Sequence, residues 1–342
     1  MHKLEIKLKQ HTPMIHFQHD QEGATLRASE VKPKLDRFLL TRLGQGNYQA
    51  GIAQAKTNGW LIGKGDHPAL DYKMRIEATA FKDVSIPVKP QKVKGVQQYD
   101  DFGRELYTTN NYPDNKASLI MSNIGGRVRE EVFNMVIANH IKMIVISKED
   151  RLIREIQRHI CRFIGRTSFG NRTSKGFGSF EVISIAGKEV ESSFYRDDFS
   201  LSFAMLLDQD YHESEVYKDV FRVIHRIWKD MKNQAGVKGK SENNVLLKIS
   251  PQNTRQAERI PSPIFFKPLV DISEDEDGQV YCDVVISTFY NREVIKQVTG
   301  RDDSTYYKQL IANIKNNVGK NIFSYIDNIV TSKLESANLE EV

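Results

Sequence analysis

The chain has 342 residues, of which 39% are apolar and 27% are charged, with 49 Lys and Arg against 44 Asp and Glu. This composition excludes a disordered chain and a membrane-embedded one. The net charge of +5 is too small to indicate nucleic acid by itself, so the distribution of the charge along the chain matters more.

Several further features bound the class of protein. A single hydrophobic core seldom extends beyond ~250–300 residues, so two domains are expected. No stretch has the ~18–20 consecutive apolar residues that a membrane-spanning helix needs. The N-terminus has charged residues where a signal peptide needs apolar ones, and the two cysteines form no disulfide or zinc pattern. We therefore expect a cytoplasmic protein.

The first half of the chain alternates strand and helix patterns. Apolar and charged residues alternate from Leu4, which predicts a strand that continues towards residue 17. An amphipathic helix is expected from about Ser29. Further strands are expected at residues 72–81, 141–146 and 177–185, and further helices at residues 127–139 and 149–165. Residues 44–70 are interpreted as loop, and residues 82–117 as a long insertion.

The second half shows the same classes of pattern. Strands are expected at residues 199–207, 245–249, 264–272 and 280–290, and helices at residues 212–233 and 304–334. A turn at Asp277-Gly278 joins the last two strands as a hairpin. The whole predicts an α+β protein of two ferredoxin-like (RRM-like) domains, residues 1–187 and 188–342, with the insertion in the first.

Four arginines form a stripe on the helix expected at residues 149–165. Arg151, Arg154, Arg158 and Arg162 are three, four and four residues apart, which puts them on one helix face. Like charges at this spacing repel unless an anion neutralises them. The arginine stripe is therefore either an anion-binding surface or an ordinary solvated face, and the charges alone do not decide between these interpretations.

The segment that follows the stripe favours the anion. Residues 169–180 combine glycines, hydroxyl groups and the cations Arg172 and Lys175. Glycine lets the backbone approach a phosphate closely, and the cations neutralise its charge. Phe177 would stack on a base in this interpretation. The alternative is a glycine turn that enters a strand, with Phe177 in the core.

Residues 172–179 resemble the glycine-rich loop of the RAMP superfamily of CRISPR-associated proteins. Residues 12–15 and 26–38 are similar to the first strand and first helix of such proteins, and residues 262–269 to a strand of their second domain. The three matches occur in the expected order. The resemblance is greatest to the two-domain RAMP subunit that caps one end of type III-B effector complexes.

The resemblance implies a non-catalytic RNA-binding subunit that acts in antiviral defence. Its partners would be guide RNA, target RNA and neighbouring effector subunits, with no metal and no cofactor. In such complexes base pairing reads sequence, and the protein contacts the RNA backbone. The resemblance implies RNA contacts by Arg27, Lys32, Asn171, Arg172, Ser174, Lys175, Gly176, Phe177 and Gly178. From the arginine stripe, Arg158 and Arg162 are also expected to contact RNA.

Two other functions remain open from the sequence. The chain could be a metal-independent endoribonuclease that processes guide RNA, and His16 would then be the candidate base because it follows Thr12-Pro13 into the presumed RNA face. It could instead be a scaffold whose arginine stripe contacts an acidic protein. Three of the nine histidines, His11, His16 and His19, lie close together in the sequence, but no further ligands have the spacing of a metal site.

Overall fold

The computed structural model describes most of two antiparallel sheets and the helices that pack on the first. The described residues are 1–15, 25–63, 68–87, 132–190, 199–208, 264–290 and 329–336, with short stretches between 89 and 108 and between 211 and 227. Within this part of the chain, no helix is long and apolar enough to cross a membrane.

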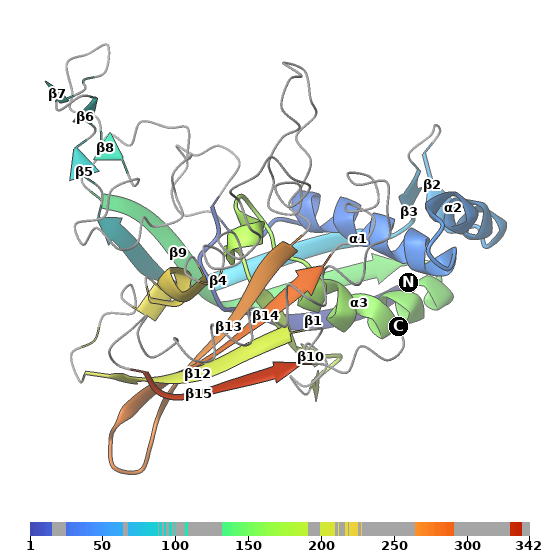
Figure 1. Cartoon of the computed structure of the whole chain (residues 1–342). Coiled ribbons are helices and arrows are strands. Elements are labelled where there is room, and N and C mark those ends of the chain that lie inside the picture. The colour runs from blue at the N-terminus through green and yellow to red at the C-terminus, as the bar shows by residue number, and fades with distance from the viewer. Residues whose placement is uncertain are drawn as a thin grey trace.

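The first sheet has five antiparallel strands in the order β11-β10-β1-β9-β4. Figure 1 shows β4 and β9 side by side. Their bounds are β1 His2–Gln10, β4 Lys73–Pro87, β9 Val132–Ser147, β10 Phe180–Ile185 and β11 Lys188–Glu189. The central strand β1 aligns Ile6 with Met143 of β9 on one side and with Ile185 of β10 on the other. The strand β1 therefore carries the register of the whole sheet.

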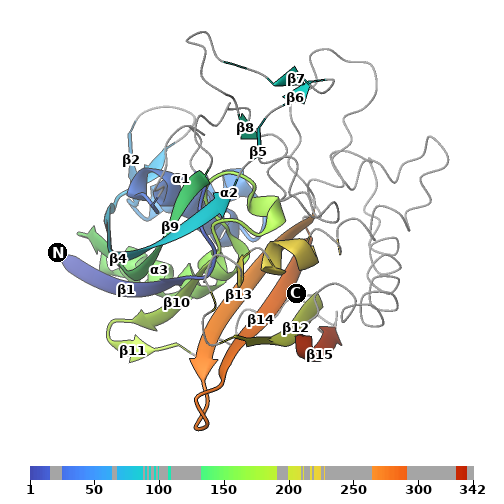
Figure 2. The ribbon, with the colours of Figure 1, turned by 90° about the vertical axis from the view of Figure 1, so that its left-hand side faces the viewer.

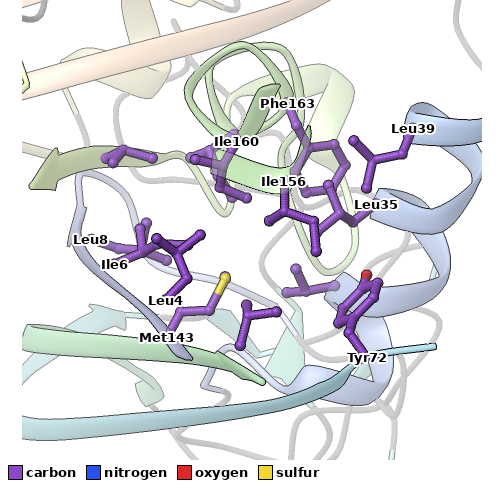
Figure 3. Close-up of a cluster of buried hydrophobic side chains, with 14 of the residues drawn as sticks. Leu4, Ile6, Leu8, Leu35, Leu39, Tyr72, Met143, Ile156, Ile160 and Phe163 are labelled. Atoms are coloured by element: carbon purple, nitrogen blue, oxygen red, sulfur yellow. The ribbon is translucent and has the colours of Figure 1, made fainter. Parts of the chain in front are cut away.

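Helices α1 (Ala28–Leu43) and α3 (Asp150–Arg166) cover one face of this sheet. Figure 3 shows the alternate residues of β1 pointing into the layer that the two helices close. The buried side chains come from both helices and from the strands, and include Leu4, Ile6, Leu8, Leu35, Leu39, Met143, Ile156, Ile160 and Phe163. The opposite face of β1 carries charged residues, and among the described residues the helices α1 and α3 lie on the apolar face.

A helical hairpin and several short strands connect these elements. Helix α2 (Tyr48–Thr57) packs against α1, and a Cβ atom on Gly51 would lie 1.8 Å from the carbonyl oxygen of Leu40. The short strands are β2 Leu61–Ile62, β3 Ala69–Leu70, β5 Lys89–Pro90, β6 Lys92–Val93, β7 Val96–Gln97 and β8 Tyr107–Thr108.

The second sheet has four antiparallel strands in the order β13-β14-β12-β15. Their bounds are β12 Phe199–Leu207, β13 Ile264–Glu274, β14 Val280–Tyr290 and β15 Ile329–Ser336. The turn between β13 and β14 has Gly278 at φ +75°, where glycine is favoured. Figure 2 shows β13 and β14 in orange beside the first sheet.

The core of the second sheet is not made by the second half of the chain alone. It combines residues of β12 and β14 with helical residues around Val220, and also with Val84 of β4 and Met135 and Ile137 of β9. Ile15 and Phe177 belong to the same cluster. The end of the β4–β9 strand pair near Val84 and Met135, its outer half, therefore packs on the second sheet. The other half of the pair belongs to the first core.

Four sequence-based expectations are wrong. The insertion expected at residues 82–117 starts too early, because residues 82–87 belong to β4. Residues 132–139 are strand β9 and not the end of a helix, because residues 132–138 pair one by one with β4. Residues 329–336 are strand β15 and not the end of a C-terminal helix, because they pair with β12. Residues 44–70 are not all loop, since they contain α2, β2 and β3.

The α+β class with antiparallel sheets is confirmed. The first sheet is built along the chain as strand, helix, strand, strand, helix, strand, with α2 and the short strands as additions. The assignment of both halves to ferredoxin-like domains stays a prediction, as does a boundary at residue 187. Residues 245–249 and 304–328, expected as strand and helix, lie outside the described residues.

The core between α3 and the sheet predicts the effect of truncating one of its side chains. Ile156 is 0% exposed, and we expect Ile156→Ala to lower the free energy of unfolding by about 2–5 kcal/mol. Ile183 lies on the same sheet but is 39% exposed, so Ile183→Ala should lower it by less than about 1 kcal/mol. Urea denaturation of both variants measures the difference, and equal losses would contradict the packing described.

Candidate nucleic-acid interface

The glycine-rich loop lies between α3 and β10 and is attached to the segment that follows β1. Its centre is a short 3-10 helix, η1 (Thr173–Lys175). The Asn171 amide donates to the Ile15 carbonyl at 2.7 Å, and the Gly178 amide donates to the Pro13 carbonyl at 3.0 Å. The segment 12–15 and the loop, both singled out in the sequence, therefore form one structural unit.

The Thr12 hydroxyl group is the innermost link of this unit. It donates to the Gly176 carbonyl at 2.7 Å and accepts a hydrogen bond from the Ser179 amide at 3.0 Å. Thr12 is 0% exposed, so both hydrogen bonds are shielded from water. A single side chain thus holds the two ends of the turn that contains Phe177.

Two glycines are needed because the backbones approach so closely. Gly170 has φ +83°, and a Cβ atom there would lie 2.5 Å from the Ile15 carbonyl oxygen. Gly178 has φ +64°, and its Cβ would lie 1.8 Å from the Phe169 carbonyl oxygen. These glycines are therefore needed for the loop to pack on the segment 12–15 and on itself, whether or not the loop also contacts a phosphate.

Most amide groups of the loop already have protein partners. The Gly170 amide donates to the Glu30 carboxylate of α1 at 2.6 Å, which occupies a position where a phosphate would otherwise bind. The amides of Asn171, Lys175, Gly176, Gly178 and Ser179 are also bonded within the unit. In the part of the chain that the structure describes, no hydrogen-bond partner is seen for the amides of residues 172–174.

Arg172 is the side chain of the loop with the strongest need for an anion. Its backbone is left-handed, with φ 58°, at the start of η1. Burial lowers the pKa of its guanidinium group, and no carboxylate offsets that shift. Among the described residues the guanidinium has no hydrogen-bond or ion-pair partner. A partly buried cation without a counterion favours the binding of an external anion.

Polar residues that are partly exposed surround Arg172. Asn171, Ser174 and Lys175 are neither buried nor fully exposed. The bond from Gly170 to Glu30 places the first turn of α1 beside the loop, so exposed Arg27, the N-cap residue of α1, lies near it. The predicted contact residues of the loop and Arg27 are therefore brought to one surface.

Phe177 is not available to stack on a base. It is 0% exposed, and its ring stacks on Phe221 with 4.0 Å between ring centroids and 13° between planes. Gly176 and Gly178 are also buried, and both bond to the segment 12–15. These three predicted RNA contacts are corrected to structural positions, as in the alternative interpretation of a core phenylalanine.

Lys32 is also engaged within the protein. Its ammonium group is 2.8 Å from the Asp36 carboxylate and 3.0 Å from the Leu70 carbonyl, and lies 4.0 Å from the centre of the Tyr72 ring. Burial raises the pKa of the Tyr72 hydroxyl group, and Asp36 raises it further. Lys32 therefore attaches α1 to the chain around Leu70 and is poorly placed to contact RNA.

The arginine stripe of α3 makes ion pairs within its own helix, so it carries less uncompensated positive charge than its sequence predicts. Exposed Arg154 pairs with Asp150, and exposed Arg158 pairs with Glu155 at 2.7 Å. Arg162 is partly exposed and has an interaction of its own. The stripe borders a surface hollow lined by His2, Asn58, Trp60, Lys148, Glu149, Asp150, Arg151, Arg154, Glu155 and Arg158. Opposite charges alternate there, so the stripe is a mixed surface with an excess of cations.

The structure contains a buried polar cluster near the loop that the sequence does not predict. Lys267 of β13 is 1% exposed, Glu181 of β10 is 8% exposed and His11 is 3% exposed. The His11 Nε2 and a Glu181 oxygen are 3.0 Å apart, and His11 Nδ1 accepts from the Val270 amide at 3.0 Å. No spacing in the sequence signals this cluster, because its members come from three strands or strand ends.

The remaining sequence candidates give no second site. His16 and His19 lie outside the described residues, so the endoribonuclease alternative has no geometry to support it. Among the described residues there is no group of three or more His, Cys, Asp or Glu that would hold a metal ion.

Comparisons with known proteins relate the chain to one family. The family model described as the Cmr1 N-terminal domain matches residues 1–235. The chain is similar to the crystal structure of apo Cmr1 from Pyrococcus furiosus, with 11% identity, 85% of this chain and 89% of that chain covered, and a TM-score of 0.41. It is also similar to the cryo-EM structure of the type III-B Cmr-beta bound to cognate target RNA. The identity is 10%, 54% of this chain and 59% of that chain are covered, and the TM-score is 0.31. No curated protein matches.

The loop geometry predicts different effects for two glycines that share a positive φ. Gly178→Ala places a Cβ against the Phe169 carbonyl, whereas the same change at Gly187, with φ +80°, meets nothing within 4 Å. Both variants carry the conformational cost of about 1 kcal/mol. We expect Gly178→Ala to lower the free energy of unfolding by at least ~2 kcal/mol more than Gly187→Ala. Similar urea denaturation midpoints would contradict the close approach.

Proposed function

The chain belongs to the Cmr1 family, and from this premise we propose that it is an RNA-binding subunit of a type III CRISPR effector complex. Its part in the complex is to hold RNA and neighbouring subunits, with guide RNA and target RNA as the nucleic-acid partners. The subunit contributes to antiviral defence by binding RNA and not by cleaving it.

The observation that carries this proposal is the Arg172 guanidinium group. It is partly buried, it is held at a left-handed backbone position, and it has no carboxylate partner among the described residues. Proteins rarely keep such a cation without a counterion. A phosphate group of RNA fits its planar donor geometry through paired hydrogen bonds.

The neighbouring side chains extend the contact along an RNA backbone. Lys175 supplies a second cation, while Asn171 and Ser174 supply hydrogen-bond donors to phosphate or ribose oxygens. Arg27 approaches from the first turn of α1. The contacts in this set go to phosphate and sugar, so the surface binds RNA without reading its bases.

The arginines of α3 extend this surface along the helix. Arg151 and Arg166 are separated by fifteen residues of α3, or about 22 Å along the helix. Arg158 and Arg162 lie between them, in the half of the helix that precedes the loop. An RNA strand bound at Arg172 would exchange the carboxylate partner of Arg158 for a phosphate.

RNA binding is tested by removing the two loop cations. Arg172→Ala with Lys175→Ala should weaken the binding of a fluorescein-labelled single-stranded oligo-uridine RNA, measured by anisotropy at several salt concentrations. Each lost phosphate contact lowers the slope of log K against log salt by about 0.7, so the slope should fall by about 1.4.

The matched control is Lys56→Ala with Lys188→Ala, which removes the same charge from two exposed positions on α2 and β11. This control should keep nearly the affinity and slope of the unchanged protein. If the two double variants bind equally well with equal slopes, the loop is not the RNA-binding surface and the proposed function fails.

A further inference from the structure

Lys267 holds the end of α3 from the second sheet. Its ammonium group donates to the Ile164 carbonyl and to the Thr167 carbonyl, the latter at 2.9 Å. Both oxygens belong to the C-terminal end of α3, where backbone carbonyls lack partners within the helix. A cation placed there also interacts favourably with the helix dipole. The cap of this helix thus comes from a strand a hundred residues later in the chain.

The glycine-rich loop follows directly on the helix end that Lys267 holds. The Cα of Gly176 faces β13 so closely that a Cβ would lie 3.2 Å from the Pro268 ring and 2.6 Å from the Ile224 side chain. Phe177 then enters the second core and stacks on Phe221. The loop is therefore held on one side by the segment 12–15 and on the other by β13.

Lys267 is an unusual residue for this position. Lysine is almost never fully buried unless it is paired, and Glu181, the acid that acts on the Lys267 charge, also contacts His11. Burial lowers the pKa of Lys267 to about 7, and Glu181 acts in the opposite direction. Other titratable groups on the elements around it are His11, Arg166, Lys175, and the Lys9–Asp271 ion pair. An apolar residue would fill the space without the cost of burying an amine.

We propose that Lys267 is a positioning residue of the RNA-binding loop, through which the second sheet sets the placement of Arg172 and regulates the affinity for RNA. The inference rests on the proposed function. Lys267 touches no RNA itself. It fixes the end of α3, and Arg172 lies six residues beyond that end.

The coupling acts in both directions. If docking of β13 on α3 favours RNA binding, RNA binding must favour the docking by the same factor. Bound phosphates also favour the charged form of Lys267, so RNA affinity should fall as pH rises through about 7. Folding stability should change in the opposite sense. The unfolded chain keeps the ordinary lysine pKa of 10.5, so stability rises with pH between about 7 and 10.5.

The test replaces Lys267 by methionine in the full chain. Lys267→Met keeps the length of the side chain and removes its donors, and Lys188→Met on β11 is the control for a lost surface charge. With the labelled oligo-uridine RNA, we expect Lys267→Met to lower affinity about tenfold and to lose most of the pH dependence from about pH 6 to about pH 8. Its denaturation midpoint should be unchanged or higher, because losing the desolvation cost of the buried amine offsets the loss of its two hydrogen bonds.

A purely structural role would instead lower the midpoint and leave the affinity of the folded fraction unchanged, which would overturn the proposal. Unchanged affinity and pH dependence in Lys267→Met would do the same, while loss of binding in the Arg172 variant would leave the proposed function standing. If Lys267→Met does not fold, hydrogen exchange of the unchanged protein decides. Added RNA should slow exchange at residues 264–274, and no slowing there overturns the inference.

Discussion

The hydrogen bonds of Thr12 are the constraint on which the rest of the structure depends. Its hydroxyl group joins the end of the central strand β1 to both ends of the turn around Phe177. Because β1 also sets the register of β9 and β10, the loop position follows from the register of the sheet. The same turn directs Phe177 into the second core. One buried hydroxyl group therefore links the first sheet, the loop and the second sheet.

Much of the fold could be predicted from the sequence, and the errors have physical causes. Helix α3 and strands β12, β13 and β14 have a clear period of apolar residues, and the structure confirms them. Residues 132–139 fit a helical period as well, but their pairing with β4 decides in favour of a strand. Such pairing joins residues far apart in the sequence, so local patterns do not reveal it. The gene family suggested by three short motifs is confirmed by the Cmr1 family model.

The candidate site could be predicted in outline only. The motifs at residues 12–15 and 172–179 do meet, and the cations Arg172 and Lys175 lie in the loop as expected. Composition could not tell that Phe177 is buried, since an aromatic residue between glycines suits a core as well as a binding surface. The cluster of Lys267, Glu181 and His11 could not be predicted from the sequence, because only the packing of two sheets brings these residues together.

The long strand pair of β4 and β9 has a consequence for the folding of the nascent chain on the ribosome. Its outer half buries Val84, Met135 and Ile137 in a core with β12, β13 and β14, strands that the ribosome delivers much later. Until then the nascent chain exposes an apolar ribbon beside an otherwise complete sheet, a state that favours aggregation or capture by chaperones. Strands β12, β13 and β14 therefore shield this ribbon as well as forming their own sheet, and a chain that stopped before them would leave it uncovered.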